Sequence, residues 1–595
     1  MKNLLTFDIE CYTNYFLVFF MNIQTGETHE FRQYNDERDH QLFEVYNVLT
    51  DPNNTIISFN GNSYDVPLTA LFLTNTTNLA LKKASDDIIN NRVMWWEFER
   101  KYDIVLPEFD HIDIIQVAPQ TASLKVYGAR IGTKKLQELP IHHQTIIMPH
   151  QVEVLDKYCH NDNIVTKELY LELEEAIKLR TVMSHEYGID LRSKSDAQIA
   201  EQVIKSEYET KTGNRLQKTS ASKSYKYNAP SFVFFQTEQF KDLLNLCQSV
   251  DFDISDKGAV LMPKKLNQVI EVANKGYQMG IGGLHSVDTP ASYYADDEYE
   301  IIDIDVTSYY PNVILNGGFE PAHIGSLFTE IYKDILNRRV KAKQEKDMVV
   351  ANSLKITING LFGKFGSRYS VVYSPDLMFH TTVTGQLCLF MLIEQFAIAD
   401  IPVISANTDG ITVKVSKAMR PHLDSLVKWW ELSTNLNMEY TFYKSIHFRD
   451  VNNYLAVKDD GAKGKGIFAE TSLSKSPANE IIYEAAKAYI LEGTDVYYTI
   501  SECSDIAKFL TLKKVTGGAN KDGEPLGATV RWYRSTATDT PISKNKLKKD
   551  GTPEKVGSSE CGMPLMNLPD EFPEDLDIAW YAQEAQQIIE QVKVK

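Results

Sequence analysis

The sequence predicts a multidomain protein of mixed α/β and α+β architecture. Three observations support this fold class. The chain of 595 residues is too long for a single hydrophobic core. Its 43% hydrophobic residues are enough to fill several cores, and strand-like runs alternate with helical patterns. We expect four regions, at residues 1–190, 191–300, 301–454 and 455–595.

Charge and cysteine usage narrow the functional class. A net charge of −18 argues against a passive coat for nucleic acid, because phosphate contacts depend on Lys and Arg. Two stretches, 205–226 and 508–555, are locally basic, which is equally consistent with solvated faces. The six cysteines lack the paired spacing of a zinc site or a disulfide framework, so we expect a reducing cytoplasm. The N-terminus shows no leader sequence and no apolar stretch near the length of a membrane span.

The first half of the chain predicts a sheet with flanking helices. Strands are expected at 4–10 and 56–59, and one long helix at 153–180. In the first strand Asp8 and Glu10 alternate with apolar residues, so their side chains project from one face. A polar segment at 211–224 predicts a linker before the second half.

The second half predicts a strand followed by a helical hairpin. The strand at 301–306 places Asp303 and Asp305 on one face. Helices are expected at about 327–346 and 350–365, and the short turn between them implies an antiparallel pair. Strands at 403–406 and 411–415 flank the sequence Asn-Thr-Asp-Gly. The remaining 180 or so residues give no clear pattern.

Carboxylates in the second half are candidates for a metal-dependent nucleotidyl transfer site. That reaction needs two carboxylates that hold two divalent cations about 4 Å apart. Asp305, at the end of its strand, and Asp409, between two strands, are our candidates. Taken alone, Asp409 followed by Gly410 is also an ordinary hairpin turn.

Helical spacing adds candidates for contacts with a nucleotide. On the helix at 350–365, Lys355, Asn359 and Phe362 share one face. On the preceding helix, Arg339 and Lys343 lie one turn apart and could face the same triphosphate. A basic pair on a helix is, by itself, more often a solvated face.

Three acidic motifs in the first half suit phosphodiester hydrolysis. They are Asp-Ile-Glu at 8–10, Asn-Gly-Asn-Ser-Tyr-Asp at 60–65 and Tyr-Cys-His-Asn-Asp at 158–162. Hydrolysis by two metals needs acidic ligands and a group that orients the attacking water. On a helix, the spacing of Tyr158 and Asp162 brings the phenol and the carboxylate together. A lone Asp-x-Glu is weak evidence, whereas three motifs in order are strong.

Together these motifs resemble those of family B DNA polymerases. Residues 305–311 are similar to the motif D-x-x-S-L-Y-P, residues 355–363 to K-x-x-x-N-S-x-Y-G, and residues 405–410 to Y-x-D-T-D-S, with Asn407 in place of the first Asp. The three N-terminal motifs are similar to the exonuclease motifs of the family and precede the others, as they do there. The resemblance extends from Asp8 to Tyr581.

The resemblance implies a fold and an activity. The fold is an RNase H-like 3′→5′ exonuclease domain at 1–190, a connector and the start of the palm at 191–300, a right-hand palm at 301–454 with a fingers hairpin at about 327–366, and a thumb with the C-terminal region at 455–595. The activity is template-directed extension of a primer with dNTPs, with proofreading of the single-stranded 3′ end. Intervals between motifs leave no room for the insertions of protein-primed relatives. A monomeric phage replicase in a bacterial cytoplasm, without membrane contact, is expected by analogy.

The resemblance also assigns roles to residues and implies Mg²⁺, two ions per active site, with Mn²⁺ as a substitute. The metal-binding positions are Asp305, Val306 and Asp409 in the polymerase site and Asp8, Glu10, Asp65 and Asp162 in the exonuclease site, where Tyr158 aligns water. The nucleotide-binding positions are Ser308, Tyr309, Tyr310, Arg339, Lys343, Lys355 and Asn359, with Tyr310 excluding a 2′-hydroxyl. The positions that contact primer–template DNA are Gly282, Gly283, Tyr454, Lys463 and Lys465.

Two other functions remain open from the sequence. Asn407, Gly410 and Asn452 depart from the family pattern, so the chain could be an exonuclease whose second half holds DNA with weakened synthesis. A non-catalytic nucleic-acid-binding protein is the other alternative. Two acidic clusters argue against it, because carboxylates repel phosphates unless a metal bridges them.

Overall fold

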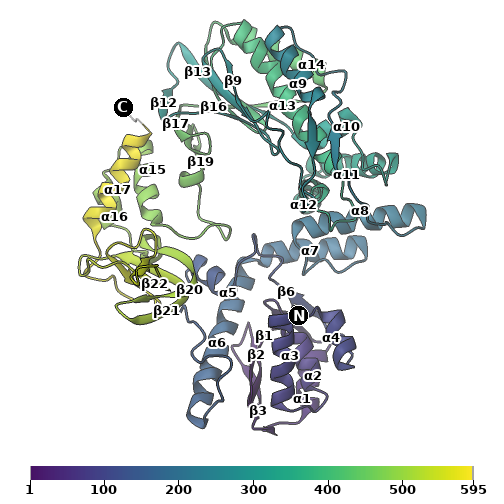
Figure 1. Cartoon of the computed structure of the whole chain (residues 1–595). Coiled ribbons are helices and arrows are strands. Elements are labelled where there is room, and N and C mark those ends of the chain that lie inside the picture. Colours follow the sequence, from purple (N-terminus) through teal and green to yellow (C-terminus); the bar gives the residue numbers. More distant parts are fainter. Residues whose placement is uncertain (1, 593–595) are drawn as a thin grey trace. The chain divides into compact units, whose positions relative to one another are not determined.

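The computed structural model describes residues 2–592, which form two compact units (Figure 1). The first unit contains the chain up to Ser195 together with Thr471–Ile481 and Glu502–Ala579. The second contains Asp196–Glu470, Ile482–Ser501 and the chain from Trp580 onward. Residues 455–595, expected as one C-terminal region, therefore contribute to both units.

The first unit contains a six-stranded sheet with β1 next to its centre. β1 pairs with β2 in the antiparallel sense and with β5 in the parallel sense. The run Tyr-Phe-Leu-Val-Phe-Phe-Met of β2 is buried along its whole length, which anchors this part of the sheet in the core. In the order β4-β3-β2-β1-β5-β6, the strands are Glu37–Arg38, Thr28–Tyr34, Tyr15–Asn22, Asn3–Tyr12, Asn54–Ser58 and His111–Asp113.

Seven helices accompany this sheet. The helix expected at 153–180 is in fact two helices, because the chain leaves the helical conformation at Leu173 (φ −96°, ψ 1°). Leu169, Leu173 and Ile177 all pack in one core cluster, so the apolar spacing continues across the break and gave no sign of it. The helices are α1 Leu42–Thr50, α2 Asp65–Phe72, α3 Asn78–Asn91, α4 Trp95–Tyr102, α5 Leu124–Arg130, α6 Pro149–Glu172 and α7 Glu174–Tyr187.

The basic C-terminal stretch forms a five-stranded sheet within the first unit. Arg531 is buried and donates to the carbonyl oxygens of Thr133 (2.8 Å) and Lys134 (3.0 Å). These bonds join the sheet to the segment that precedes α6. The strands, in the order β23-β22-β20-β21-β24, are Pro553–Lys555, Ser543–Leu547, Thr511–Lys521, Glu524–Arg534 and Gly562–Pro564, and the short helix η2 is Ile506–Phe509.

The second unit is built around a seven-stranded sheet in which β13 lies between β15 and β16. In the order β16-β13-β15-β14-β11-β10-β9, the strands are Met438–Tyr443, Tyr299–Val306, Gly410–Ser416, Val403–Asn407, Leu284–Ser286, Lys275–Met279 and Val269–Val272. A four-stranded sheet contains β12 Ala291–Tyr294, β17 Ser445–Asp450, β18 Asn453–Lys458 and β19 Gly461–Lys465. A small sheet pairs β7 Ser224–Lys226 with β8 Asp251–Asp253.

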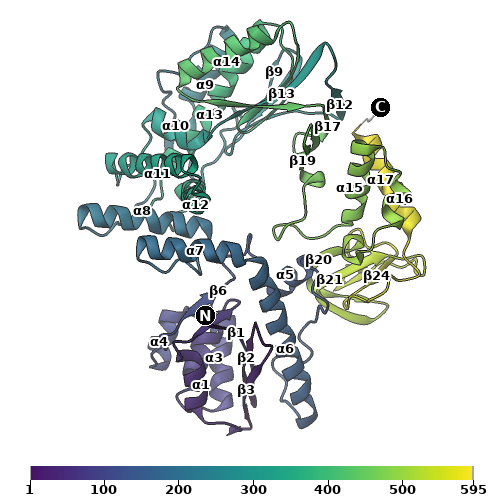
Figure 2. The ribbon, with the colours of Figure 1, turned by 180° about the vertical axis from the view of Figure 1, so that it is seen from behind.

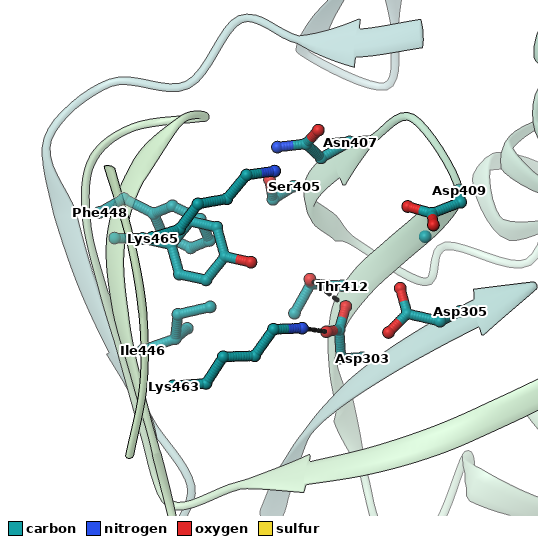
Figure 3. Close-up of a pocket in the computed structure, with 12 residues that line it drawn as sticks. Asp303, Asp305, Ser405, Asn407, Asp409, Thr412, Ile446, Phe448, Lys463 and Lys465 are labelled. Atoms are coloured by element: carbon teal, nitrogen blue, oxygen red, sulfur yellow. Dashed lines mark hydrogen bonds and ion pairs between the residues drawn. The ribbon is translucent and has the colours of Figure 1, made fainter. Parts of the chain in front are cut away.

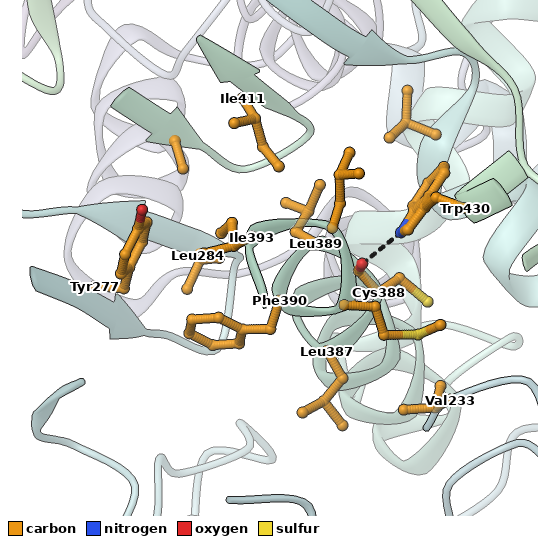
Figure 4. Packing of buried hydrophobic residues seen from close by; sticks show 14 of the residues in the cluster. Val233, Tyr277, Leu284, Leu387, Cys388, Leu389, Phe390, Ile393, Ile411 and Trp430 are labelled. Atoms are coloured by element: carbon orange, nitrogen blue, oxygen red, sulfur yellow. Dashed lines mark hydrogen bonds between the residues drawn. The ribbon is translucent and has the colours of Figure 1, made fainter. Parts of the chain in front are cut away.

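The core of the second unit is centred on α13 (Pro375–Ile398), which packs with residues of the large sheet (Figure 4). By length and composition alone this helix could span a membrane. However, 89% of its apolar window is buried inside the protein. Trp430 of α14 (Arg420–Thr434) donates to the carbonyl of Cys388 on α13 at 2.6 Å. This hydrogen bond fixes α14 against α13.

A helical hairpin of α11 (Ser326–Gln344) and α12 (Met348–Phe365) confirms the two expected helices to within two residues at each end. α8 (Asp196–Thr212) lies along α12 in both views (Figures 1 and 2). The approach is close at Gly360, where a Cβ atom would meet the backbone of Asp196. The remaining helices are α9 Glu238–Ser249, α10 Tyr309–Gly317, η1 Gly466–Phe468, α15 Glu480–Glu492, α16 Val496–Ser501 and α17 Ile578–Gln591.

Candidate active sites

Asp305 and Asp409 lie next to each other at one end of the large sheet. Asp305, near the end of β13, is paired with Gly410 at the start of β15. The amide of Val306 donates to the main-chain carbonyl of Asp409 at 2.8 Å. Pairing of β13 with β15 therefore brings together two carboxylates that are more than 100 residues apart in the chain, and we call this group the second acidic site.

The second acidic site opens into a cavity of 150 Å³ (Figure 3). Asp303, Asp305 and Asp409 contribute negative charge to it, and Lys463 and Lys465 contribute positive charge. The complete lining is Asp303, Asp305, Ser405, Asn407, Asp409, Gly410, Thr412, Ile446, Phe448, Tyr454, Lys463 and Lys465. Of the predicted DNA contacts, Tyr454, Lys463 and Lys465 thus face the carboxylates.

The electrostatics of this site suit a divalent cation. Burial, followed by the charges of Asp303 and Asp409, raises the pKa of Asp305 to about 7. The pKa of Asp409 is also raised, because the surrounding protein restricts its hydration. A hard cation bound between the two carboxylates would compensate this cost, and carboxylate oxygens are the ligands that Mg²⁺ and Mn²⁺ prefer.

The turn between β14 and β15 explains two departures from the expected motif. Asn407 pairs with Gly410, and Thr408 adopts a left-handed conformation (φ 61°) that β-branched residues rarely occupy. A side chain at position 410 would collide with Asp305 Oδ1, so glycine allows the close approach of the two strands. Asn407 does not interact with the carboxylates, since its amide donates to the Val451 carbonyl at 2.8 Å.

A second cavity, of 320 Å³, shares Asp409 with the first. Four predicted nucleotide-binding residues, Ser308, Tyr309, Tyr310 and Asn359, line it. The other lining residues are Val306, Pro311, Tyr332, Ile358, Phe362, Thr408 and Asp409. The two cavities therefore join a pair of carboxylates to an aromatic pocket between α10 and α12.

Tyr310 is held in this pocket by two contacts. Its ring stacks on Phe362 with a centroid distance of 4.9 Å, and its hydroxyl donates to the Gly282 carbonyl at 2.5 Å. A Cβ atom at Gly283 would lie 2.9 Å from the Thr408 side chain and 3.1 Å from the Tyr310 hydroxyl. The predicted glycine pair therefore lies beside Tyr310 and Thr408, two residues that line the cavity.

The three predicted basic residues of the hairpin do not line either cavity. Lys343 and Lys355 are exposed, and Lys355 shares its helix face with Asn359. Arg339 Nη1 donates to Ser308 Oγ at 3.3 Å, while its Nε atom is buried and has no hydrogen-bond partner among residues 2–592. Arg339 is thus the one of the three that reaches toward the pocket residues.

The first unit brings the four predicted N-terminal acids to one place, the first acidic site. Asp8 and Glu10 project from β1, Asp65 begins α2, and Asp162 lies on α6. Carboxylate oxygens of Asp8 and Glu10 and the Cys159 sulfur lie within 4.8 Å of one another, as in groups that hold a metal ion. The predicted residues of this site are therefore neighbours in space.

Burial dominates the electrostatics of the first acidic site. It raises the pKa of Asp8 to about 7, and it also raises the pKa of Glu10, Asp65 and Asp162. Asp65 Oδ1 is buried and has no hydrogen-bond partner in the described part of the chain. Buried carboxylates with an unpartnered oxygen fit a divalent metal, which would supply the missing positive charge.

Two residues of this site were not predicted as functional. Lys125 Nζ donates to the Tyr158 hydroxyl at 2.6 Å and lies 3.0 Å from both carboxylate oxygens of Asp162. Asp113 accepts the amides of Asn60 at 2.8 Å and Asn62 at 3.0 Å, so it holds the loop before Asp65. Lys125 lies at the start of α5 and Asp113 at the end of β6, both between the second and third acidic motifs.

No family model matches this chain. Among solved structures, the family B DNA polymerase of Pyrobaculum calidifontis aligns with a TM-score of 0.42 and 14% identity, covering 100% of this chain and 79% of that one. Among curated proteins, DNA polymerase 1 of Saccharolobus solfataricus is 24% identical over 136 residues, which are 22% of this chain and 15% of that protein.

DNA polymerase 1 of Sulfolobus acidocaldarius is 23% identical over 226 residues, or 31% of this chain and 25% of that protein. The matched segments thus span a quarter or less of these two relatives. These two relatives confirm the resemblance of this chain to DNA polymerases, which its motifs predicted.

Proposed function

We propose that this chain is a DNA-directed DNA polymerase of family B that extends a primer 3′ end with dNTPs and removes mispaired nucleotides by 3′→5′ hydrolysis. The observation that supports synthesis most strongly is the position of Asp409, which lines both cavities. It belongs to the carboxylate pair with Asp305 and also to the pocket that contains Tyr310. Such a position suits a residue that connects the reacting end of a primer to an incoming nucleotide.

In the proposed polymerase site, Asp305 and Asp409 hold two divalent cations, with the main chain of Val306 beside them. When bound, Mg²⁺ or Mn²⁺ activates the primer hydroxyl and neutralises charge on the triphosphate. The Tyr310 ring, fixed by Phe362, lies under the sugar and leaves no space for a 2′-hydroxyl. Proposed contacts with the nucleotide come from Ser308, Tyr309, Arg339, Lys343, Lys355 and Asn359.

In the proposed exonuclease site, Asp8, Glu10, Asp65 and Asp162 hold the metal ions. The Tyr158 hydroxyl orients the attacking water. Lys125 donates a hydrogen bond to the Tyr158 hydroxyl, so the Tyr158 oxygen acts as the acceptor. The Tyr158 hydroxyl proton therefore points away from the lysine. Metal-assisted hydrolysis needs this combination of acidic ligands and a fixed polar group near the water.

The proposed domain roles follow the same assignment. The six-stranded sheet and its helices form the RNase H-like exonuclease domain, the seven-stranded sheet forms the palm, and α11 with α12 forms the fingers. The thumb comes from residues 455–595. We propose that the protein acts as a monomer on primer–template DNA. A phage origin and a bacterial cytoplasm are also proposed, by analogy alone, because the relatives reported above are archaeal.

Primer extension with the purified chain tests this proposal. The full chain is incubated with a labelled primed template and Mg²⁺, with and without dNTPs. We expect elongation when dNTPs are present and shortening from the 3′ end when they are absent. Shortening without any elongation in Mg²⁺ or Mn²⁺ would favour the alternative, an exonuclease whose second half only holds DNA.

A further inference from the structure

Asp303 is a buried acid of the second acidic site that has no role in the assignments above. It lies on β13 two residues before Asp305, and the two side chains project from the same face of the strand. Asp303 is 7% exposed and lines the 150 Å³ cavity together with Asp305 and Asp409. It is therefore the third carboxylate that faces this cavity.

Two hydroxyl donors and one ion pair fix the Asp303 carboxylate, and Figure 3 shows the contacts with Thr412 and Lys463. Oδ1 accepts from the Thr412 hydroxyl at 2.9 Å, and Oδ2 accepts from the Tyr443 hydroxyl at 2.7 Å. Oδ2 also lies 3.9 Å from Lys463 Nζ. The two hydroxyl groups come from β15 and β16, the neighbours of β13, so the sheet itself sets the orientation of the carboxylate toward Lys463.

The cavity lacks one carboxylate that the motif resembled by residues 405–410 would supply. Residues 405–410 resemble a motif that has an aspartate where this chain has Asn407, and the Asn407 amide is bonded to the Val451 carbonyl. Asn407 and Asp303 nevertheless line the same cavity. Because Asn407 is neutral, the charged residues of the lining are three aspartates and two lysines. An aspartate at position 407 in addition to Asp303 would place a fourth negative charge beside the proposed metal site.

We propose that Asp303 is a positioning residue that takes the place of the carboxylate absent at Asn407 and holds Lys463 at the cavity, directed toward a phosphate of the bound nucleic acid. This inference rests on the proposed polymerase function. In this chain the anchoring carboxylate is on β13 instead of β14. The Lys463 side chain is 50% exposed, so it has enough freedom to reach a phosphate. Its ion pair with Asp303 keeps the amine near the cavity.

Moving the carboxylate tests the proposal. The full-length variants Asp303→Asn, Asn407→Asp and the double variant are compared with wild type in steady-state primer extension. We expect Asp303→Asn to lower kcat/KM by roughly tenfold or more, because Lys463 loses its anchor. The double variant, which restores a carboxylate to the cavity at position 407, is expected to recover to within about threefold of wild type. Asn407→Asp alone is expected to lose activity through the extra charge.

Thr412→Ala is the matched control, because it removes one hydrogen bond to Asp303 but leaves the carboxylate and Lys463. Its loss is expected to be smaller than that of Asp303→Asn. Equal losses in these two variants, or a double variant no better than Asp303→Asn, would overturn the proposal in favour of a purely structural acid. Unfolding temperatures show whether lost stability accounts for the rates. Failure of the wild type to extend would instead contradict the proposed function.

Discussion

The two acidic sites differ in how their negative charge is compensated. In the first site Lys125 Nζ contacts both carboxylate oxygens of Asp162 at 3.0 Å, and its side chain is 17% exposed. In the second site Lys463 Nζ lies 3.9 Å from Asp303, and its side chain is 50% exposed. One site thus has a fixed, enclosed cation, and the other has a cation that is held loosely at a cavity.

This difference corresponds to the two proposed reactions. Hydrolysis of a terminal nucleotide needs water and a strand end in one fixed geometry, which an enclosed lysine and a buried tyrosine can provide. Synthesis must admit a nucleotide and then a shifted primer end at each step. A cavity that shares Asp409 with an aromatic pocket and is lined by partly exposed lysines is suited to such repeated exchange.

Separate loss of the two activities is the largest effect we expect. Asp409→Ala removes a carboxylate shared by both cavities of the second unit, so primer extension should fall by at least about 10³-fold. Digestion of a single strand should remain, because the first acidic site lies in the other unit. The measurement is a gel assay of the same enzyme preparation with and without dNTPs.

The reciprocal variant is Asp8→Ala combined with Glu10→Ala, which should abolish digestion and leave extension intact. If Asp409→Ala still extends primers, the assignment of the second acidic site is wrong. If both activities fall together in either variant, the two sites are not independent and the comparison above fails.

Lys125 sharpens the contrast between a fixed and a loosely held cation. Lys125→Met keeps much of the side-chain volume but removes the bonds to Tyr158 and Asp162, and we expect digestion to slow by about 10²-fold. The matched control is Lys157→Met, because Lys157 is an exposed lysine of α6 paired with Glu153. Digestion rates of single-stranded DNA measure both variants. Equal, small effects of the two substitutions would show that Lys125 has no part in the reaction.

Local patterns predicted much of both sites. Period-two alternation placed Asp8 and Glu10 on one strand face and Asp305 at the end of another, and apolar spacing gave α11 and α12. These features depend on neighbouring residues in the chain, so the sequence contains them directly.

Long-range contacts were not predictable in the same way. Asp303 acquires its neighbours only when β13 is paired with β15 and β16, and Lys125 reaches Asp162 only when α5 packs beside α6. Arg531 binds carbonyl groups almost 400 residues earlier in the chain, so the pattern around it gave no sign of its place in the first unit. The break at Leu173 was hidden because its burial follows helical spacing.

The aromatic pocket should discriminate sugars, with an effect of intermediate size. Tyr310→Ala removes the ring stacked on Phe362, and we expect ribonucleotide incorporation relative to deoxynucleotide to rise roughly 10- to 100-fold. Tyr310→Phe keeps the ring and removes only the bond to the Gly282 carbonyl, so it serves as the control with a change of a few-fold at most. Competition between rNTP and dNTP on one template gives the ratio. Unchanged discrimination in Tyr310→Ala contradicts the steric role of the ring.

The smallest expected effect is on the stability of the metal-free protein, and it compares the two sites directly. The pKa values of Asp8 and Asp305 are both raised from 3.8 to about 7. Between these values the folded state binds more protons than the unfolded state, so this contribution to stability is present at low pH and is lost as pH rises toward 7. At pH 8 in a chelator, Asp8→Asn should therefore raise the free energy of unfolding by about 1–3 kcal/mol.

Asp305→Asn should give a smaller gain under the same conditions, because Asp305 faces a cavity and the charge of Lys463. A chain of two units need not unfold in one step. Calorimetry that resolves two unfolding transitions therefore measures the stability of each unit separately. Both gains should disappear near pH 4, where the carboxylates are protonated in the folded protein, and should shrink when Mg²⁺ is added. A gain that persists at pH 4 cannot come from ionisation, and it would assign the stabilisation to packing of the amide instead.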